Sequence, residues 1–581
     1  MDHDTLFRTA KAWADADPDA ATAAEVHALI AAKNTAELED RFSTSLEFGT
    51  AGLRGVLGGG TNRMNRAVVR RTTLGLARYL KATVPDVTTR GVIIGRDGRV
   101  LSAEFARDAA AVLAAEGIPA WVFKGVAATP LTAFAVIRHN AAAGIMVTAS
   151  HNPPEYNGYK VYWGNGAQIV PPHDTGIAKA IDDVGPAKDV ALMNEDEARR
   201  KSLFHDVKDA VTRAYVDAIL ALRPTRQTEG VSIVYTAMHG VGGALVLQSL
   251  GEAGFKNVAP VPEQQEPDGR FPTVRFPNPE EKGAMDLSTA LANRVGADLV
   301  LANDPDADRL AVMARDAAGK LVMLTGNEVG VLLGHFLLTQ QKTDNPLVVT
   351  TIVSSAQLKA IAQALGSRYA ETLTGFKWIA NEAIEELKQG VNFVVGYEEA
   401  LGYSVGPVVR DKDGIGAALV VADMAAWCKA RGLTLFGYLE EVQRAHGLFV
   451  ARQFNATLPG ATGAAAIKAV MDGFRAKPPS TIGASRIAAT NDYQQQTRVE
   501  AGKTSALTLP KSNVVAYELE GGHRVTLRPS GTEPKIKFYF EWRETMSAGE
   551  PIATARARAT QRLEALEAAF LPLAAERGLP R

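Results

Sequence analysis

The 581-residue sequence lacks several features that would point to whole classes of protein. It contains a single cysteine, Cys428, so no disulfide can form within the chain and a reducing compartment is expected. No run of about 18 apolar residues is present, so we expect no membrane-spanning helix and no membrane partner. The start, Met1 to Asp4, does not have the pattern of a signal peptide, and we therefore expect a cytoplasmic protein.

The sequence also lacks an excess of either charge. Its 63 Lys and Arg residues and 64 Asp and Glu residues give a formal net charge of -1. No overall field therefore favours nucleic acid as a partner, and any charged ligand has to be bound by local groups. A hydrophobic content of 46% is typical of a globular protein, and the length predicts several domains.

Alternating strand and helix patterns occupy most of the chain. In each of three successive segments, 45–210, 211–324 and 325–450, apolar runs of strand length alternate with helical stretches. This alternation predicts three similar mixed α/β domains with mostly parallel sheets. In each segment, one strand ends in a loop rich in functional side chains. The first segment continues from its loop to about residue 210 as a polar stretch, which we expect to be irregular.

The two ends of the chain have a different character. Residues 1–44 predict two amphipathic helices that form an N-terminal extension and cover the body, with partner binding as the alternative. Residues 451–581 contain a hairpin pattern across Gly521-Gly522 and a helical pattern from Ala553 to Phe570, which Pro572 should end. This end predicts a smaller, separate α+β domain.

The apolar run Ala141–Val147 predicts a buried strand that leads into Thr148-Ala149-Ser150-His151-Asn152-Pro153. Ligands bind at the carboxyl ends of strands in parallel sheets, so Ser150 is a candidate carrier of a covalent group. Prolines and the Asn157-Gly158 pair exclude regular structure, which places Ser150, His151 and Lys160 on one constrained loop. A lone serine in a loop is more often an ordinary turn residue, so this interpretation depends on the other motifs.

Three aspartates, Asp304, Asp306 and Asp308, alternate with Pro305 and Ala307 before Arg309. An extended backbone would direct all three carboxylates to one face, where two charges about 4 Å apart cost roughly 4 kcal/mol at an effective dielectric near 20. A bound dication removes this repulsion, and hard oxygen ligands favour Mg²⁺ or Ca²⁺. An EF-hand starting at Asp304 is excluded because arginine stands where glycine and glutamate are required. A solvated acidic turn is the alternative.

Three further stretches predict the binding of anions and hydroxyl groups. Arg54 lies among glycines in the stretch from 47 to 55, where a backbone can approach an anion closely. The loop Arg528-Pro529-Ser530-Gly531-Thr532 combines a guanidinium fork, two hydroxyls and a glycine, as a phosphate clamp does. Glu398-Glu399 supplies acceptors suited to sugar hydroxyls. Taken singly, each stretch has a simpler explanation as a solvated turn or hairpin.

Two common reaction classes are not supported by motifs. The sequence has no Gly-x-x-x-x-Gly-Lys-Ser/Thr loop for a nucleotide, and Ser150 is not in a Gly-x-Ser-x-Gly pattern. A serine that can carry phosphate, a dication site, hydroxyl acceptors and a separate phosphate clamp together indicate phosphoryl transfer on a sugar phosphate.

In this order, the loops at 148–153, 304–309, 398–400 and 528–532 resemble the four signature loops of the α-D-phosphohexomutase superfamily, the phosphoglucomutase/phosphomannomutase family. The resemblance covers about residues 40–575. It implies four domains around a central cleft, with one loop from each domain. It also implies small sugar phosphates as ligands, Mg²⁺ as cofactor, a sugar bisphosphate such as glucose 1,6-bisphosphate as activator and intermediate, and a monomer or homodimer.

The resemblance also implies a role for each loop residue. Ser150 would become the phosphoserine and bind Mg²⁺ together with Asp304, Asp306 and Asp308. Arg54 and Lys160 would lie beside it, with Lys160 in proton transfer, and His151 would orient the loop. The substrate site would comprise Arg309, Thr374, Glu398, Ala400, Lys412, Arg528, Ser530, Gly531 and Thr532.

The third loop departs from the form with serine that hexose-specific members often have, because Ala400 follows the two glutamates. This form, with Gly396-Tyr397 ahead of it, is similar to the branch that includes phosphopentomutases and glucose-1,6-bisphosphate synthase. We expect interconversion of glucose 1-phosphate and glucose 6-phosphate, with a phosphopentomutase or phosphomannomutase as alternatives. A non-catalytic sugar-phosphate sensor and a phosphatase are alternatives from other classes; the retention of Ser150 with all three aspartates argues against the sensor.

Overall fold

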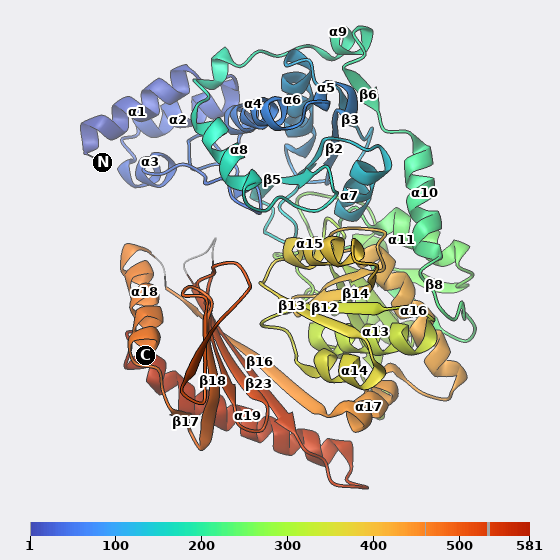
Figure 1. The fold of residues 1–581 in the computed structure, drawn as a ribbon. Coiled ribbons are helices and arrows are strands. Elements are labelled where there is room, and N and C mark those ends of the chain that lie inside the picture. Colours follow the sequence, from blue (N-terminus) through green and yellow to red (C-terminus); the bar gives the residue numbers. More distant parts are fainter. Residues whose placement is uncertain (1, 459, 531–534, 581) are drawn as a thin grey trace.

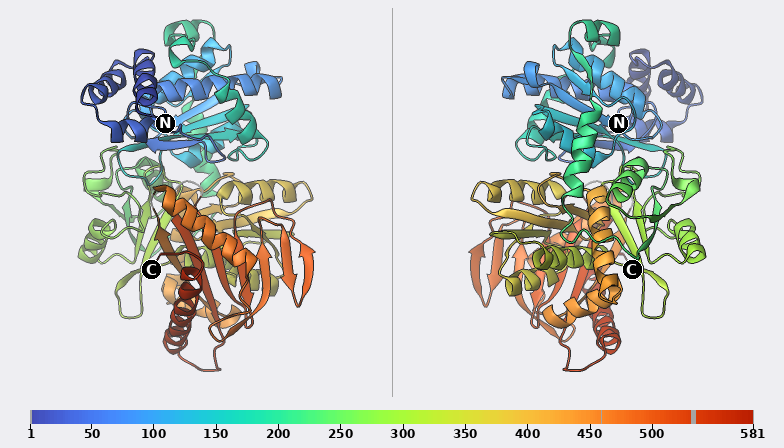
Figure 2. Two further views of the ribbon diagram at one scale, coloured as in Figure 1. Left: turned by 90° about the vertical axis from the view of Figure 1, so that its left-hand side faces the viewer. Right: turned by 90° about the vertical axis from the view of Figure 1, so that its right-hand side faces the viewer.

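The computed structural model of the chain describes residues 2–458, 460–530 and 535–580. Three α/β domains follow an N-terminal group of helices and precede a C-terminal domain (Figure 1). The first domain and the C-terminal domain lie at opposite ends of the view, and the second and third domains lie side by side between them (Figures 1 and 2). Within the described residues, no helix has both the length and the apolar character needed to cross a bilayer.

The first 42 residues form three helices, not the two predicted: α1 (His3–Asp15), α2 (Ala20–Ala31) and α3 (Thr35–Phe42). The expected second helix is divided because Lys33 adopts a positive φ of 52° and the Asn34 side chain accepts a hydrogen bond from the Glu37 N–H. Asn34 therefore caps a new helix. The three helices share a small core of their own that includes Leu6, Val26, Leu38 and Phe42.

The first α/β domain is built on six strands in the order β1-β5-β4-β2-β3-β6. β5 runs antiparallel to both of its neighbours, whereas β4, β2, β3 and β6 run parallel. The strands are β1 (Leu53–Val56), β2 (Val92–Arg96), β3 (Ala120–Val122), β4 (Ala143–Val147), β5 (Tyr156–Trp163) and β6 (Phe204–Asp206). The helices are α4 (Arg66–Thr83), α5 (Val87–Arg90), α6 (Ser102–Ala115), α7 (Thr129–Arg138), α8 (His173–Asp182) and α9 (Glu195–Arg200).

The stretch after Ser150 is more regular than we expected, because Asn157, Gly158 and Lys160 lie in β5 and not in a loop. A Cβ atom on Gly158 would lie 2.6 Å from the carbonyl oxygen of Thr148, so glycine serves close strand approach and not a turn. The side-chain amide of Asn157 is hydrogen-bonded inside the domain, since its Nδ2 donates to the Val100 carbonyl oxygen at 2.9 Å. The expected irregular tail to residue 210 is likewise wrong, because it contains α8, α9 and β6.

The second and third domains repeat the same plan. The second has the strand order β11-β10-β9-β7-β8 and the third β13-β12-β14-β15. The second comprises α10 (Asp209–Leu220), β7 (Ser232–Thr236), α11 (Gly243–Glu252), β8 (Asn257–Pro260), α12 (Asp286–Val295), β9 (Leu299–Asn303), β10 (Leu310–Arg315) and β11 (Leu321–Met323). The third comprises α13 (Gly326–Gln340), β12 (Pro346–Thr351), α14 (Gln357–Leu365), β13 (Arg368–Thr372), α15 (Phe376–Leu387), β14 (Asn392–Glu398), β15 (Gly402–Val405), α16 (Gly414–Ala430) and α17 (Leu435–His446).

One four-strand core is common to the three sheets. Its spatial order is β5-β4-β2-β3 in the first sheet, β10-β9-β7-β8 in the second and β15-β14-β12-β13 in the third. In each, the first strand of this order runs antiparallel to the other three and comes last along the chain. The connection into the antiparallel strand is in each case one of the predicted functional loops: 148–155, 304–309 or 399–401. The prediction of three similar mixed α/β domains is confirmed.

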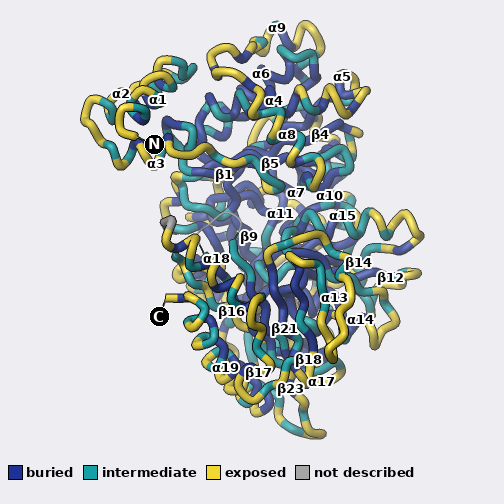
Figure 3. The backbone as a smooth tube through the Cα atoms, turned by 60° about the vertical axis from the view of Figure 1, so that its left-hand side comes forward, coloured by how far each residue is buried: buried dark blue, intermediate teal, exposed yellow. Residues whose placement is uncertain are grey.

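The C-terminal domain is built on an antiparallel sheet whose strands follow the order β16-β23-β22-β21-β18-β19-β20, with β17 paired to β18. Its elements are β16 (Leu448–Thr457), α18 (Gly460–Ala476), β17 (Thr481–Ile482), β18 (Ser485–Asp492), β19 (Thr497–Glu500), β20 (Lys503–Ala506), β21 (Val515–Leu519), β22 (His523–Pro529), β23 (Lys535–Glu544) and α19 (Ile552–Ala575). The expected α+β domain is therefore present. In the molecule as a whole, the sheets form much of the buried interior (Figure 3).

The last helix, α19, continues through Pro572, although we expected proline to end it. Phe570 and Ala574 lie on either side of this proline and are buried in the core of the C-terminal domain. Packing against the sheet therefore keeps the chain helical past a residue that has no N–H to donate.

Candidate active site

Ser150 lies just beyond the end of β4 in a conformation that few residues other than glycine adopt, with φ at 53°. Its hydroxyl donates to Asp304 Oδ2 at 2.8 Å and lies 3.2 Å from His151 Nδ1. Its N–H donates to Thr148 Oγ1 at 2.8 Å, which stabilises the turn. The residue is only 6% exposed. The turn thus directs one hydroxyl of the first domain to the acidic loop of the second.

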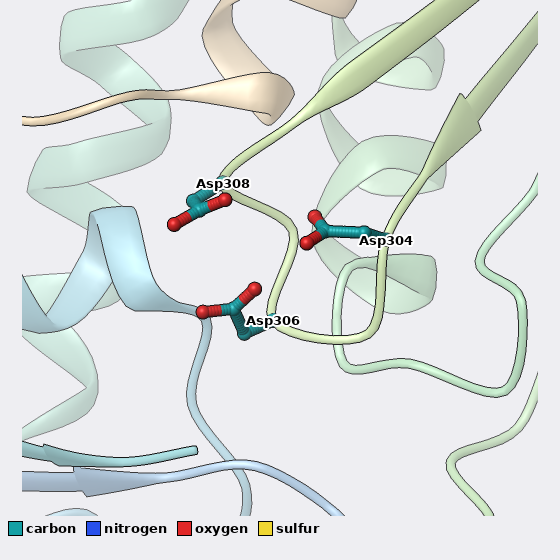
Figure 4. A group of neighbouring side chains, drawn as sticks. All are labelled: Asp304, Asp306 and Asp308. Carbon is teal, nitrogen blue, oxygen red and sulfur yellow. The ribbon is translucent and has the colours of Figure 1, made fainter. Parts of the chain in front are cut away.

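The three aspartates project from the loop between β9 and β10 (Figure 4). This loop is a turn, with Ala307 at φ 59°, and not the extended segment from which we expected the carboxylates to converge. They converge nevertheless, because one oxygen from each lies within 4.8 Å of the others. All three residues are fully or almost fully buried.

Two lysines contact Asp306 and Asp308 through the Oδ2 atom of each carboxylate. Oδ2 of Asp306 accepts from Lys160 at 2.8 Å and from Thr129 at 2.7 Å. Oδ2 of Asp308 accepts from Lys160 at 3.0 Å and lies 3.2 Å from Lys412 Nζ. Oδ1 of both aspartates is buried without a hydrogen-bond partner among the described residues. Such oxygens suit a hard dication, so the donor set fits Mg²⁺.

Burial and the neighbouring charges set the charge state of the cluster. Burial raises the pKa of Asp304 well above its usual range, and the charges of Asp306 and Asp308 raise it further. Burial also acts to raise the pKa of Asp308, but Lys160 and Lys412 outweigh it and hold this pKa below its usual range. Burial acts to lower the pKa of Lys160, but Asp306 and Asp308 raise it above its ordinary value. Lys160 is therefore an ammonium.

Arg54 lies beside the serine loop, and His151 lies within it. Arg54 lies opposite Gly158 in the ladder between β1 and β5, and its Nη1 donates to Asn152 Oδ1 at 3.2 Å. Burial lowers the pKa of His151 well below its ordinary value, and the positive charges of Arg309 and Arg54 lower it further. The imidazole is therefore neutral near pH 7.

The third domain places its loop against the loop of the second. Arg309 Nη1 donates to the Ala400 carbonyl at 3.1 Å, and Arg309 forms an isolated antiparallel bridge with Gly402. Glu398 Oε1 accepts from the Gly375 N–H at 2.7 Å. Thr374 Oγ1 is buried and has no hydrogen-bond partner within the described part of the chain. Thr374 and Glu398 thus present polar groups next to a loop that contacts the acidic turn.

The fourth loop begins at the end of β22. Arg528 Nη1 lies at 3.5 Å from the Tyr539 hydroxyl, and the Ser530 N–H donates to the Lys535 carbonyl at 2.8 Å. Its other predicted members, Gly531 and Thr532, lie outside the described residues. Arg528 lies close enough to the third domain to lower the pKa of Lys377, although burial is the main cause of that shift.

Two basic residues beside these loops, the half-buried Lys377 and the buried Arg99, were not identified from the sequence. Lys377, in α15, donates to Thr50 Oγ1 of the first domain. Arg99, after β2, contacts the backbone of the serine loop. A signal for Arg99 was available, because Asp97-Gly98-Arg99 directly follows a strand pattern and the carboxyl ends of parallel strands favour ligand sites.

Comparison with known proteins agrees with this arrangement. Sequence models of phosphoglucomutase/phosphomannomutase match the chain in four parts: α/β/α domain I at residues 45–187, domain II at 213–319, domain III at 325–444 and the C-terminal domain at 475–559. The chain belongs to the phosphoglucomutase/phosphomannomutase family. As a member of this family it is a phosphosugar mutase, an isomerase that acts by phosphoryl transfer.

Relatives within the family are named for different sugars. Human phosphopentomutase is 38% identical over 563 residues, which cover 91% of this chain and 90% of that protein. A phosphoglucomutase of Staphylococcus epidermidis is 37% identical over 506 residues, which cover 87% and 92%. The open form of the Paramecium phosphoglucomutase parafusin shares the fold, with a TM-score of 0.65 at 19% identity over 90% of this chain and 96% of that one.

Proposed function

We propose that this mutase interconverts α-D-glucose 1-phosphate and glucose 6-phosphate through a phosphoserine at Ser150 and a bisphosphorylated sugar. The observation that carries the proposal is the position of the Ser150 hydroxyl, 2.8 Å from Asp304 Oδ2 and next to the buried carboxylate cluster. A serine oxygen held there can accept and return a phosphoryl group under strong electrostatic control.

Asp304, Asp306 and Asp308 are the residues that would hold Mg²⁺, together with a phosphate oxygen on Ser150. When bound, the ion would supply positive charge opposite the oxygens of the transferring phosphoryl group. The chain supplies further positive charge from Arg54 and Lys160, which support the proposal because both approach the serine loop or its acidic neighbours.

The proposed chemistry consists of two transfers of opposite direction. In the first, a hydroxyl oxygen of the sugar monophosphate attacks the phosphorus of phosphoserine, and the bond from phosphorus to Ser150 Oγ breaks. The Lys160 ammonium gives a proton to the serine oxygen and takes up the proton that the sugar hydroxyl loses, so atoms and charge balance. We assign this proton transfer to Lys160 and orientation of the loop to His151. The bisphosphate, glucose 1,6-bisphosphate, then turns end for end, and Ser150 takes back the other phosphoryl group.

The remaining loops would hold the sugar phosphate between the two transfers. Thr374 supports this assignment, because its buried hydroxyl oxygen has no hydrogen-bond partner among the described residues. The guanidinium of Arg528 suits the phosphate that does not react, which lies at opposite ends of the sugar in the two transfers. We assign the substrate to Arg309, Thr374, Glu398, Ala400, Lys412, Arg528, Ser530, Gly531 and Thr532.

A panel of sugar 1-phosphates tests the function. Purified protein with Mg²⁺ and a trace of glucose 1,6-bisphosphate should turn over glucose 1-phosphate faster than ribose or mannose 1-phosphate. Ser150→Ala should abolish turnover of each sugar with the melting temperature unchanged. Activity in that variant would refute the carrier role, and release of inorganic phosphate in every turnover would indicate a phosphatase.

A phosphopentomutase acting on ribose 1-phosphate and ribose 5-phosphate is the second candidate. Two observations favour it: Ala400 supplies no hydroxyl to the sugar, and human phosphopentomutase is among the relatives at 38% identity. If ribose 1-phosphate is turned over faster than glucose 1-phosphate in the same panel, the proposed substrate changes to ribose phosphate and the proposed role of Ser150 is unchanged.

A further inference from the structure

Arg99 is a buried arginine that binds the serine loop entirely through backbone carbonyl groups. Its Nη2 donates to the carbonyl oxygen of Ser150 at 2.6 Å and to that of Asn152. Its Nη1 donates to the carbonyl oxygens of Pro153 at 2.7 Å and Tyr156 at 3.1 Å. The side chain is 0% exposed. One guanidinium therefore connects three residues of the loop that carries the candidate serine with the first residue of β5.

The guanidinium itself is fixed by two domains. In the first domain, the Asp97 carboxylate lies 3.3 Å from Arg99 Nε and accepts from the Ser102 hydroxyl at 2.7 Å. In the second domain, the Phe271 ring lies against the guanidinium with its centroid 4.9 Å away. The backbones are equally close, since a Cβ atom on Gly269 would lie 2.6 Å from Arg99 Cα. The arginine is thus anchored from two sides.

The serine loop needs such an anchor because its conformation is unfavourable in isolation. A non-glycine residue in the left-handed region, as Ser150 is, is strained and persists only where its surroundings determine it. A planar guanidinium offers five donors in a fixed fork, which suits several carbonyl groups at once. An ammonium group is a compact charge with three donors and cannot reproduce this pattern.

We propose that Arg99 is a positioning residue for phosphoryl transfer, which fixes the serine loop so that the Ser150 oxygen stays aligned with the attacking sugar hydroxyl. This inference rests on the proposed carrier role of Ser150. Arg99 contacts neither the hydroxyl nor the sugar in this account; it acts through the loop backbone. Misplacement of a reacting group by about 1 Å can reduce a rate by roughly 10²-fold, so a loosened loop affects the chemical step before it affects binding.

Arg99→Lys tests this role because it keeps the charge next to Asp97 and removes the fork. We expect kcat to fall by roughly 10- to 100-fold, with KM for the sugar phosphate changed far less. Hydrolysis of phosphoserine should also take a larger share of turnovers. In that side reaction a water oxygen attacks phosphorus, the bond to Ser150 Oγ breaks, the serine oxygen gains a proton and inorganic phosphate leaves.

Arg223 offers a closely matched control. Its Nη1 donates to the Ala253 carbonyl at 2.9 Å and its Nη2 to the Gln227 carbonyl at 3.0 Å. It pairs with Asp423 at 3.3 Å, lies over the Phe255 ring at 5.2 Å and has a side chain that is 5% exposed. Arg223→Lys should therefore reduce the melting temperature about as much as Arg99→Lys, but leave kcat and phosphate release at wild-type values.

The comparison separates failure of this inference from failure of the proposed function. If Arg99→Lys and Arg223→Lys have the same kcat while wild-type Ser150 carries an exchangeable phosphate, the positioning role is wrong and the carrier role stands. If wild-type Ser150 carries none, the proposed function fails as well. A higher KM with unchanged kcat in Arg99→Lys also overturns the inference.

A second pair of variants decides the question if Arg99→Lys does not fold. Phe271→Leu removes the ring against the Arg99 guanidinium without changing the serine loop, and Phe255→Leu does the same at Arg223. We expect a lower kcat and more phosphate release for Phe271→Leu only. Equal values in the two variants would contradict the positioning role.

Discussion

Single residues of the site combine full burial with charge. Asp306 and Asp308 each have one carboxylate oxygen on an ammonium group and one without a partner among the described residues. Lys377 is a half-buried cation that donates a hydrogen bond to a neutral hydroxyl, that of Thr50. Such charges cost free energy in the folded protein unless a ligand compensates them.

The pKa of Lys377 makes this cost measurable. The pKa falls from 10.5 to about 8, chiefly because of burial and to a smaller extent because of Arg528, while Glu398, Asp174 and Asp411 oppose the change. Between these two values the unfolded chain binds a proton that the folded chain has released, so the free energy of unfolding rises with pH over this range. Below it, folding has to bury the ammonium. Lys377→Met should therefore melt at a higher temperature than wild type at pH 7, and the difference should narrow towards pH 10.

Thr50→Val is the control for this experiment, because it keeps the lysine and removes only the acceptor of its hydrogen bond. This variant should retain the wild-type pH dependence of the melting temperature. A difference between Lys377→Met and wild type that is equal at pH 7 and pH 10 would show that the lysine charge is not its source.

Residue types at the site were largely predictable, and their partners were not. Ser150 and the three aspartates come directly after strand patterns, and their residue types alone indicate a hydroxyl nucleophile and a carboxylate cluster. Arg99 and Lys377 are ordinary basic residues in the sequence. Their significance depends on contacts with the 150–156 carbonyl groups and with Thr50, which only the folded chain brings together.

At the level of elements, one connection type provides three of the four loops: the turn from the last parallel strand into the antiparallel strand. Helix starts support the same region. Asp413 caps α16, and its Oδ1 accepts from the N–H groups of Ile415 at 3.1 Å and Gly416 at 2.9 Å. The same oxygen accepts from the Tyr215 hydroxyl at 2.8 Å. The capping residue immediately follows Lys412, whose ammonium forms an ion pair with the Asp308 carboxylate.

Replacement of this cap tests how much it stabilises α16. Asp413→Ala removes a helix cap, worth about 1 kcal/mol, and leaves the buried Tyr215 hydroxyl unpaired, which costs about 1–3 kcal/mol. We expect chemical denaturation to show a free energy of unfolding lower by about 2–4 kcal/mol. Asp413→Asn keeps an acceptor oxygen and should lose much less. Equal losses would show that the negative charge, and not the hydrogen bonds, stabilises the helix start.

Element types were predicted better than element limits. The strand before Ser150 and the helix α15 were predicted from hydrophobic patterns, because these patterns depend on burial within a single domain. Gly158 and Pro572 misled the sequence analysis, because tertiary packing overrode their local preferences in β5 and α19. The aspartate turn was also missed, since an αL residue at Ala307 has no distinct signal in the sequence.

At the scale of the whole molecule, the site is assembled from contacts between domains. Thr129 of the first domain and Lys412 of the third both meet the acidic turn of the second. In the C-terminal domain, Arg524 donates to the Ser354 carbonyl of the third domain. The order of the domains could be predicted from the chain, but these contacts join residues far apart in sequence and could not.

Because different domains supply the groups for the sugar phosphate and for Mg²⁺, a substitution in one domain should affect the binding of only one of these ligands. Arg528→Ala, in the C-terminal domain, should raise KM for the sugar phosphate by roughly 10-fold or more, since it removes charge-assisted hydrogen bonds worth about 1.5–3 kcal/mol. The increase in melting temperature caused by Mg²⁺ should remain, because the carboxylates belong to the second domain. Arg486→Ala, at a side chain that is 76% exposed in the same domain, is the control. Equal loss of sugar and Mg²⁺ binding would contradict the clamp assignment.

The most direct test of the central claim follows the phosphoryl group itself. Protein labelled with radioactive phosphate is isolated, its labelled residue is identified by mass spectrometry, and unlabelled glucose 1-phosphate is added for a single turnover. We predict that the label lies on Ser150 and passes into the sugar phosphates, and that Ser150→Ala acquires none. Interconversion of glucose 1-phosphate and glucose 6-phosphate without passage of label through Ser150 would contradict the account.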